Sequence, residues 1–164
     1  MLTPTGTKTR DQMSGAFGFW LWMLMKLPAA LFCGVRLKEV GEERCVTTIP
    51  YGWRSQNPFK STYFAAQAMA AEMSTGALVL LATADAEVPF STLIVDMKAT
   101  FGKKAIGLAT FTCEGGPATW AAVKEAKATG EARVIALDTV GRLADGTEVS
   151  RFTFTWSVKP RSGR

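Results

Sequence analysis

The residue best suited to chemistry is Glu72, the only acidic side chain between residues 57 and 76, in a stretch rich in alanine. A carboxylate buried among apolar side chains loses hydration, so its pKa rises and it can serve as a general base or nucleophile. Asn57 lies fifteen residues earlier and could hydrogen-bond a carbonyl oxygen or a water molecule. Each has a structural alternative. Glu72 would pair with a basic residue across a subunit interface or accept backbone hydrogen bonds, and Asn57 would cap a helix, which we favour for this residue.

Several kinds of chemistry are excluded by composition. Histidine is absent, which removes Ser-His-Asp and Cys-His catalysis, His-ligated metals and imidazole acid–base chemistry. The cysteines are odd in number and far apart (Cys33, Cys45 and Cys113), so we expect buried thiols in a reducing, cytoplasmic compartment, with no metal site and no disulfide. We expect no cofactor. The net charge of +5 comes from scattered basic residues, so we expect no nucleic-acid binding.

The elements that must position Glu72 follow from residue spacing. The segment from Asn57 to Thr75 or Gly76 predicts a helix that is apolar on almost every side and therefore belongs in a core. Extended segments are predicted within residues 35–51 and at 91–101, 105–114, 132–140 and 148–158, with a short helix starting at Pro117. Strand 91–101 alternates apolar and polar residues and is expected to be half-buried. This order predicts an α+β fold, in which an antiparallel sheet wraps around a central Ala-rich helix and a helical insertion separates two strands.

The two ends of the chain differ in character. Residues 1–14 predict a flexible tail, residues 35–159 the domain, and residues 160–164 a basic tail. Residues 15–34 are rich in aromatic and aliphatic side chains and predict an extra N-terminal helix, packed on the domain or on a partner subunit. Lys26 and Pro28 argue against a membrane span, but contact of residues 16–35 with a membrane surface, or insertion, is the alternative.

The order of elements, Asn57, Glu72 and the strand from Leu93 to Gly102 resemble the hotdog-fold superfamily, specifically the acyl-CoA thioesterases of the phenylacetate-pathway type and their relatives. The similarity covers roughly Val35 to Val158. It implies hydrolysis of an acyl thioester such as acyl-CoA at the interface of a homodimer or homotetramer. The catalytic residues that it implies are Glu72, as general base or nucleophile, and Asn57.

The same resemblance implies the substrate-binding residues, which are Tyr63, Phe64, Ala65, Ser74, Thr75 and Lys98. Backbone N–H groups of the first three would hold the thioester oxygen at the helix start. Ser74 and Thr75 would contact substrate or water in the partner's site, and Lys98 occupies a position that is often polar or basic. Where these thioesterases usually carry His-Gly-Gly, this chain has Tyr63-Phe64-Ala65. That difference motivates a second hypothesis, a non-catalytic hotdog protein that binds a fatty-acyl or other apolar ligand.

Overall fold

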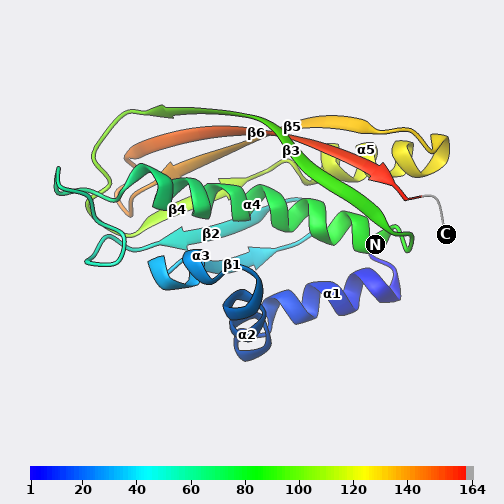
Figure 1. Ribbon diagram of the computed structural model, residues 1–164, viewed down its shortest axis with the longest axis horizontal. Helices are drawn as coiled ribbons and strands as arrows, with labels where there is room; N and C mark the ends of the chain where they lie inside the picture. The colour runs from blue at the N-terminus through cyan, green and yellow to red at the C-terminus, as the bar shows by residue number, and fades with distance from the viewer. Residues whose placement is uncertain (162–164) are drawn as a thin grey trace.

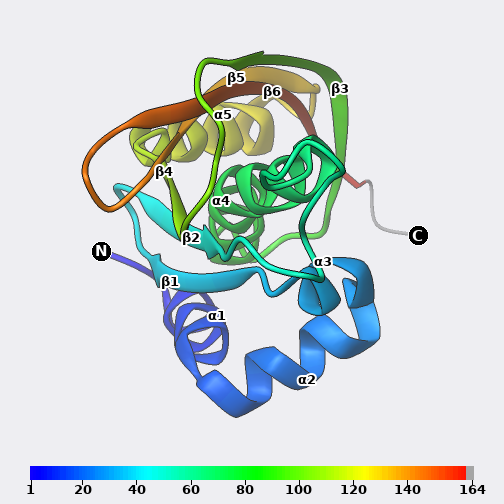
Figure 2. The same cartoon turned by 90° about the vertical axis from the view of Figure 1, so that its left-hand side faces the viewer.

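The computed structural model describes residues 1–161, in which a six-stranded antiparallel sheet curves around one long helix, α4 (Phe64–Asp85) (Figure 1, Figure 2). The strand order is β1-β2-β4-β5-β6-β3. The strands are β1 (Arg36–Val40), β2 (Cys45–Ile49), β3 (Phe90–Phe101), β4 (Ala109–Cys113), β5 (Arg133–Arg142) and β6 (Glu148–Pro160). The predicted α+β fold, with an antiparallel sheet around a central Ala-rich helix, is confirmed.

Helix α4 forms the core because it is apolar on almost every side. Its alanines let the sheet approach closely, and Ala70, Leu78 and Leu81 are fully buried. Among residues 1–161, α4 is the one helix long and apolar enough to cross a membrane, yet 61% of its most apolar window is buried inside the fold. The sheet and neighbouring helices therefore cover most of this apolar surface.

Helix α4 begins and ends later than the sequence predicted. Residues 57–62 form a loop in which the side-chain oxygen of Asn57 accepts hydrogen bonds from the N–H groups of Phe59 (3.0 Å) and Ser61 (3.3 Å). Asn57 thus stabilises a turn ahead of the helix and does not cap it. Gly76 does not end the helix, because the buried residues from Ala77 to Ala82 continue its core-facing surface.

Strand β3 forms one edge of the sheet and pairs with β6. The strand lies where the sequence predicted it, but its burial was predicted wrongly: Leu93, Val95 and Met97 are 64%, 52% and 49% exposed. Helix α4 packs mainly on β2, β4 and β5, so it leaves these side chains uncovered. An edge strand with exposed apolar side chains and open backbone groups can pair with another strand.

Three helices form a layer beside α4 and β1 (Figure 2): α1 (Pro4–Ser14), α2 (Ala16–Lys26) and α3 (Pro28–Cys33). Residues 4–14, predicted as part of a flexible tail, form α1 and pack on α4. The single helix predicted over 15–34 is divided at Leu27, because Pro28 starts a new helix. Neither part approaches the roughly 20 residues that a membrane-spanning helix needs.

The remaining elements follow the predicted order. The helical insertion is α5 (Gly116–Thr129), between β4 and β5. Strand β4 is shorter than predicted, because most of residues 102–108 lie in a loop. Of the predicted basic tail, Pro160 ends β6, and residues 162–164 lie outside the described residues.

Two of the three cysteines face each other across neighbouring strands. Cys45 of β2 lies opposite Cys113 of β4, and both thiols are free and buried, as predicted. Cys33 is only half-buried. Burial raises the pKa of the Cys45 thiol well above its usual range and that of Cys113 to about 11. Both strand thiols therefore stay protonated at neutral pH and react slowly.

Candidate active site

Glu72 lies at an apolar cavity of about 230 Å³ between α4, the N-terminal helices and the edge of the sheet. The cavity wall includes Met13, Phe19 and Trp22 from the N-terminal helices, Thr92 from β3 and Trp156 from β6. Burial raises the pKa of the Glu72 carboxyl above its ordinary value. No hydrogen bond or opposite charge within residues 1–161 offsets this cost of burial. No backbone group among residues 1–161 bonds to the Glu72 side chain, and a basic partner across a subunit interface stays a prediction.

Gly76 lies one helical turn after Glu72 and has no side chain. The Glu72 carboxylate occupies the space that a side chain at position 76 would fill. A Cβ atom at Gly76 would lie 2.9 Å from Oε1 of Glu72 and 3.3 Å from Cζ2 of Trp156. Thr75 holds the Trp156 ring, because its Oγ1 accepts a hydrogen bond from the indole Nε1 at 3.1 Å. The same hydroxyl donates to the backbone oxygen of Glu72 at 3.0 Å. Thr75 therefore positions the aromatic wall of the cavity.

The predicted substrate-binding residues Ser74, Thr75 and Lys98 do not themselves line this cavity. Ser74 is fully buried, and its Oγ lies 2.7 Å from both the backbone oxygen of Ala71 and Oγ1 of Thr139 on β5. Its hydroxyl links α4 to the sheet. Lys98 is exposed on the edge strand β3, opposite Thr153 of β6.

The start of α4 forms a second part of the predicted site. Within the described chain, this helix has no side-chain cap, so the N–H groups of Phe64 and Ala65 in its first turn point out of the helix end. The N–H of Tyr63 is already bonded to the backbone oxygen of Ser55 at 2.7 Å. Asn57 and Phe64 line a cavity of about 460 Å³ at this end, together with Lys103 and Lys104.

The two parts of the site are separated along α4. Glu72 lies eight residues beyond Phe64, which corresponds to about 12 Å along a helix that rises 1.5 Å per residue. One thioester carbonyl group cannot contact both places in the same protomer. The structure therefore brings Asn57 together with the helix start, but not with Glu72.

A larger apolar cavity lies next to the one that contains Glu72. It measures about 600 Å³ and lies beneath α2, lined also by Gly18 and Met25. The side chains that line both cavities are Met13, Phe19, Trp22 and Leu80. Ligand sites commonly measure roughly 300–1,000 Å³, so this space is large enough for an apolar group that extends from Glu72.

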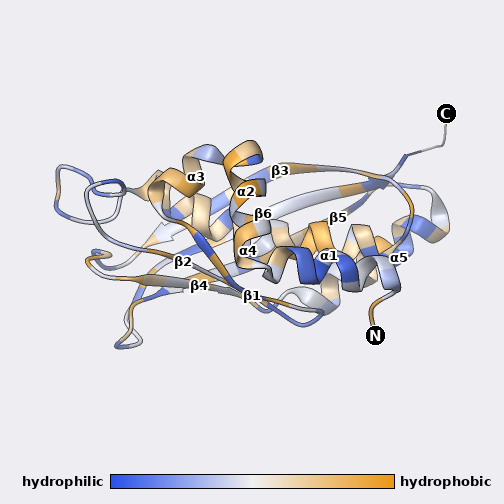
Figure 3. Cartoon of the chain, turned by 90° about the horizontal axis from the view of Figure 1, so that it is seen from below, coloured by the Kyte–Doolittle hydropathy of each residue, from blue (hydrophilic) through white to orange (hydrophobic). Residues whose placement is uncertain are grey.

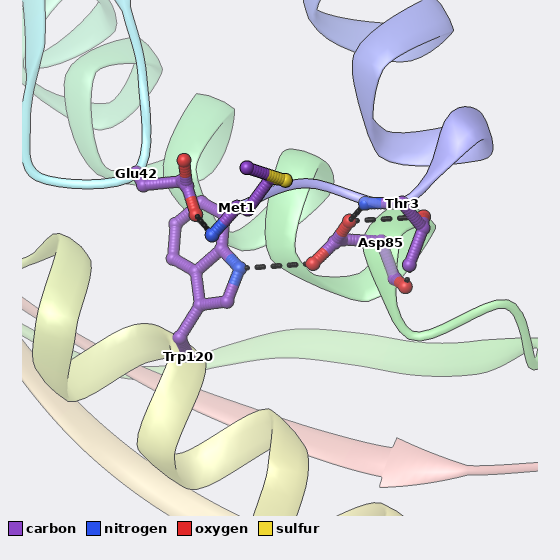
Figure 4. Close-up of polar contacts among 5 residues, drawn as sticks. All are labelled: Met1, Thr3, Glu42, Asp85 and Trp120. Atoms are coloured by element: carbon purple, nitrogen blue, oxygen red, sulfur yellow. Dashed lines mark hydrogen bonds and ion pairs between the residues drawn. The ribbon is translucent and has the colours of Figure 1, made fainter.

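Helices α1 and α2 form one wall of both cavities. Asp85, the last residue of α4, holds the start of α1 in place, and the sequence did not single it out (Figure 4). Oδ1 of Asp85 accepts hydrogen bonds from the N–H (2.7 Å) and the hydroxyl (3.0 Å) of Thr3. Its Oδ2 accepts one from the indole N–H of Trp120 at 3.2 Å. Thr3 in turn caps α1 by accepting from the N–H of Gly6. The only sequence signal was Thr3 followed by Pro4, a common helix start.

The sequence matches one family of proteins along most of its length. Residues 18–158 match the family described as "Domain of unknown function (DUF4442)", and the chain belongs to this family. No curated protein matches the chain.

Solved structures share the fold at low sequence identity. A candidate thioesterase of Shewanella oneidensis has a TM-score of 0.74 and 9% identity, covering 94% of this chain and 99% of its own. A candidate thioesterase of Pseudomonas aeruginosa has a TM-score of 0.72 and 18% identity, covering 98% and 99%. A thioesterase of Haemophilus influenzae has a TM-score of 0.63 and 15% identity, covering 85% and 88%. These similarities confirm the hotdog fold of thioesterase-like proteins.

Proposed function

We propose that this protein hydrolyses an acyl thioester, such as an acyl-CoA, with Glu72 as general base or nucleophile. The observation that carries the proposal is the Glu72 carboxylate, which lies unpaired at an apolar cavity of a hotdog fold. The apolar walls suit an acyl chain, and the adjoining cavity beneath α2 offers room for a longer one.

As a general base, Glu72 takes a proton from a water molecule, and the resulting hydroxide attacks the thioester carbonyl carbon. Negative charge then develops on the carbonyl oxygen. The N–H groups of Phe64 and Ala65 at a helix start can stabilise that charge. Collapse of the tetrahedral intermediate breaks the carbon–sulfur bond, and the leaving sulfur takes the proton held by Glu72. The carboxylic acid and the thiol are released, and Glu72 is again a carboxylate.

The proposal requires a second copy of the chain, because Glu72 and the helix start are about 12 Å apart in one protomer. The exposed edge strand β3 supports such an assembly. Pairing of two β3 strands about a two-fold axis would extend the sheet and place the two α4 helices antiparallel. Glu72 of one copy would then approach Asn57 and the helix start of the other, in a homodimer or a homotetramer. Lys98 on β3 would lie at this interface.

A second candidate function is binding of a fatty-acyl or other apolar ligand without turnover. It is favoured by the aromatic start of α4, where the rings of Tyr63 and Phe64 pack edge to face at 4.8 Å. These rings stand where a thioester group would approach the N–H groups. Native mass spectrometry that finds a co-purified lipid on a protein without hydrolase activity would favour this function.

The test is hydrolysis of acyl-CoAs with short, long and aromatic acyl groups by the wild type and by Glu72→Gln. We expect turnover of at least one substrate by the wild type. We expect loss of about 100-fold or more in kcat for the variant, as removal of a general base predicts. The matched control is Glu87→Gln, the same substitution at an exposed carboxylate in the turn that follows α4.

The two results that would contradict the proposal differ in meaning. Absence of turnover by the pure wild-type protein across all substrates would exclude hydrolase activity on acyl-CoA. Equal rates for the wild type and Glu72→Gln would leave the activity and exclude the role of Glu72. We further propose that the protein works in the cytoplasm, where thiols stay reduced, and the free thiols of Cys45 and Cys113 support this.

A further inference from the structure

Helix α2 is apolar on two opposite faces, and one of them is uncovered. Its inner face packs into the protein through Phe19, Trp22 and Met23, of which Met23 is only 2% exposed. Its outer face carries apolar side chains that recur at helical spacing and are 42–78% exposed, namely Phe17, Trp20 and Leu24. We call these three residues the outer stripe. Leu21 and Met25 lie beside it, are 41% and 65% exposed, and also line the cavity beneath α2. A helix that is apolar all round needs a cover on each face.

The charges around the outer stripe indicate what covers it. Residues 12–38 contain no acidic side chain. Residues 1–38 hold five Lys or Arg and one Asp, a net charge of +4 against +5 for the whole chain. Lys8 on α1 and Lys26 at the end of α2 are exposed, and so are Arg36 and Lys38 on β1, beside the same helical layer (Figure 2). The charged residues before and after the stripe in the sequence are therefore mainly basic.

We propose that the outer stripe docks on an anionic membrane surface, with α2 lying in the plane of the lipid headgroups. Tryptophan and phenylalanine side chains favour that depth, and lysines beside them attract anionic lipids. In the hydropathy colouring of Figure 3, α2 is predominantly apolar, whereas α1 beside it carries polar stretches. This combination of an apolar helix and a polar neighbour suits shallow insertion and not a membrane span.

A second copy of the chain is the competing occupant, and the size of the stripe argues against it. An 11-residue helix is about 16 Å long. One face of it cannot supply the roughly 800 Å² per partner that a stable protein interface buries. Strand β3, with 12 residues and exposed apolar side chains, offers the larger contact between copies. Membrane docking therefore leaves the β3 edge available, and it does not depend on the proposed reaction.

The test is co-sedimentation of the full chain with vesicles of phosphatidylcholine alone or mixed with phosphatidylglycerol. We expect the wild type to bind the anionic vesicles and to bind the neutral ones much more weakly. Trp20→Ser/Leu24→Ser is expected to lower binding by at least about tenfold, because two large apolar side chains no longer leave water. Lys26→Glu is expected to weaken binding to anionic vesicles by about fivefold or more, with little effect on neutral ones.

A matched control is Ile106→Ser/Val134→Ser, which removes two apolar side chains of similar exposure (60% and 61%) outside α2. It should bind as the wild type does. Circular dichroism and thermal unfolding verify that each variant is folded, and single Leu24→Ser replaces the double variant if that one is not. Three results would overturn the proposal: no wild-type binding to either vesicle, wild-type binding by the stripe variants, or a change of oligomeric state in those variants. The last result would mean that the stripe joins two copies of the chain.

Discussion

Replacing Gly76 with alanine tests whether the position of the Glu72 carboxylate matters independently of fold stability. The new Cβ atom would lie 2.9 Å from Oε1 of Glu72 and 3.3 Å from Cζ2 of Trp156. Ordinary van der Waals contact needs about 3.5 Å, so the carboxylate must move by about 0.5 Å or more. A side-chain end can make that shift more easily than the Trp156 ring, which is held by Thr75.

Gly76→Ala has two opposing effects on the free energy of unfolding. Alanine is about 1 kcal/mol more favourable than glycine inside a helix, and the tight contact with Trp156 offsets part of that gain. We therefore expect stability to change by less than about 1 kcal/mol, or roughly 2–4 °C in Tm for a chain of this size. Misplacing a catalytic group by about 1 Å can reduce the rate about 100-fold, so we expect about a tenfold loss in kcat/KM.

The assay is release of free thiol from the best acyl-CoA substrate, with Tm measured on the same preparations. Gly41→Ala, between β1 and β2, is the control for adding a methyl group to a glycine, because a Cβ there meets no atom within 4 Å and the residue lies outside both cavities. A kcat/KM for Gly76→Ala within about twofold of the wild type would refute the reasoning that Gly76 positions the carboxylate.

Three further perturbations follow from the structure. Burial raises the pKa of the Glu72 carboxyl above its unfolded value near 4.5, so the folded chain binds that proton more tightly than the unfolded chain. The folded chain therefore loses stability as pH rises from about 4.5 through the pKa of the folded state. Glu72→Gln should therefore raise Tm at neutral pH and leave it unchanged below about pH 4, and unfolding curves across pH that show the opposite trend would contradict this. Asp85→Ala removes the acceptor for Thr3 and Trp120 and should lower stability by about 1–3 kcal/mol, with faster hydrogen exchange in residues 1–26. Val95→Lys places a charge on the β3 edge and should convert the assembly to folded monomers in analytical ultracentrifugation, whereas an unchanged mass would exclude pairing along β3.

The fold was predictable because the sequence pattern is locally consistent. Alternation in 148–158 placed Phe152, Phe154 and Trp156 on one face, and all three are buried in the core. The alanine-rich helix could only be buried. The start of this helix was predicted too early, because Asn57-Pro58 is a good signal both for a helix start and for a turn. The hydrogen bonds from Phe59 and Ser61 to Asn57 are what select the turn.

The candidate site was predictable only in part, because the spacing of residues in a sequence does not tell which neighbouring element each side chain faces. Glu72 was found because it is an isolated charge on an apolar helix. Burial of β3 was predicted wrongly, since alternation shows that a strand has two faces but not whether α4 covers either one. The contact between Thr3 and Asp85 joins residues 82 positions apart. No local pattern encodes such a pairing, so the anchoring of α1 was beyond prediction.

The separation of Glu72 from the start of α4 has a genetic consequence. In the proposed homodimer, each α4 contributes its carboxylate to one site and its helix start to the other. A copy with Glu72→Gln and a copy with Phe64→Pro, which removes one first-turn N–H at a position where proline is tolerated, would each be inactive alone. Random mixing would restore one intact site in each heterodimer, or about a quarter of all sites. Defects at the two ends of one helix would thus complement each other when both copies share a cell.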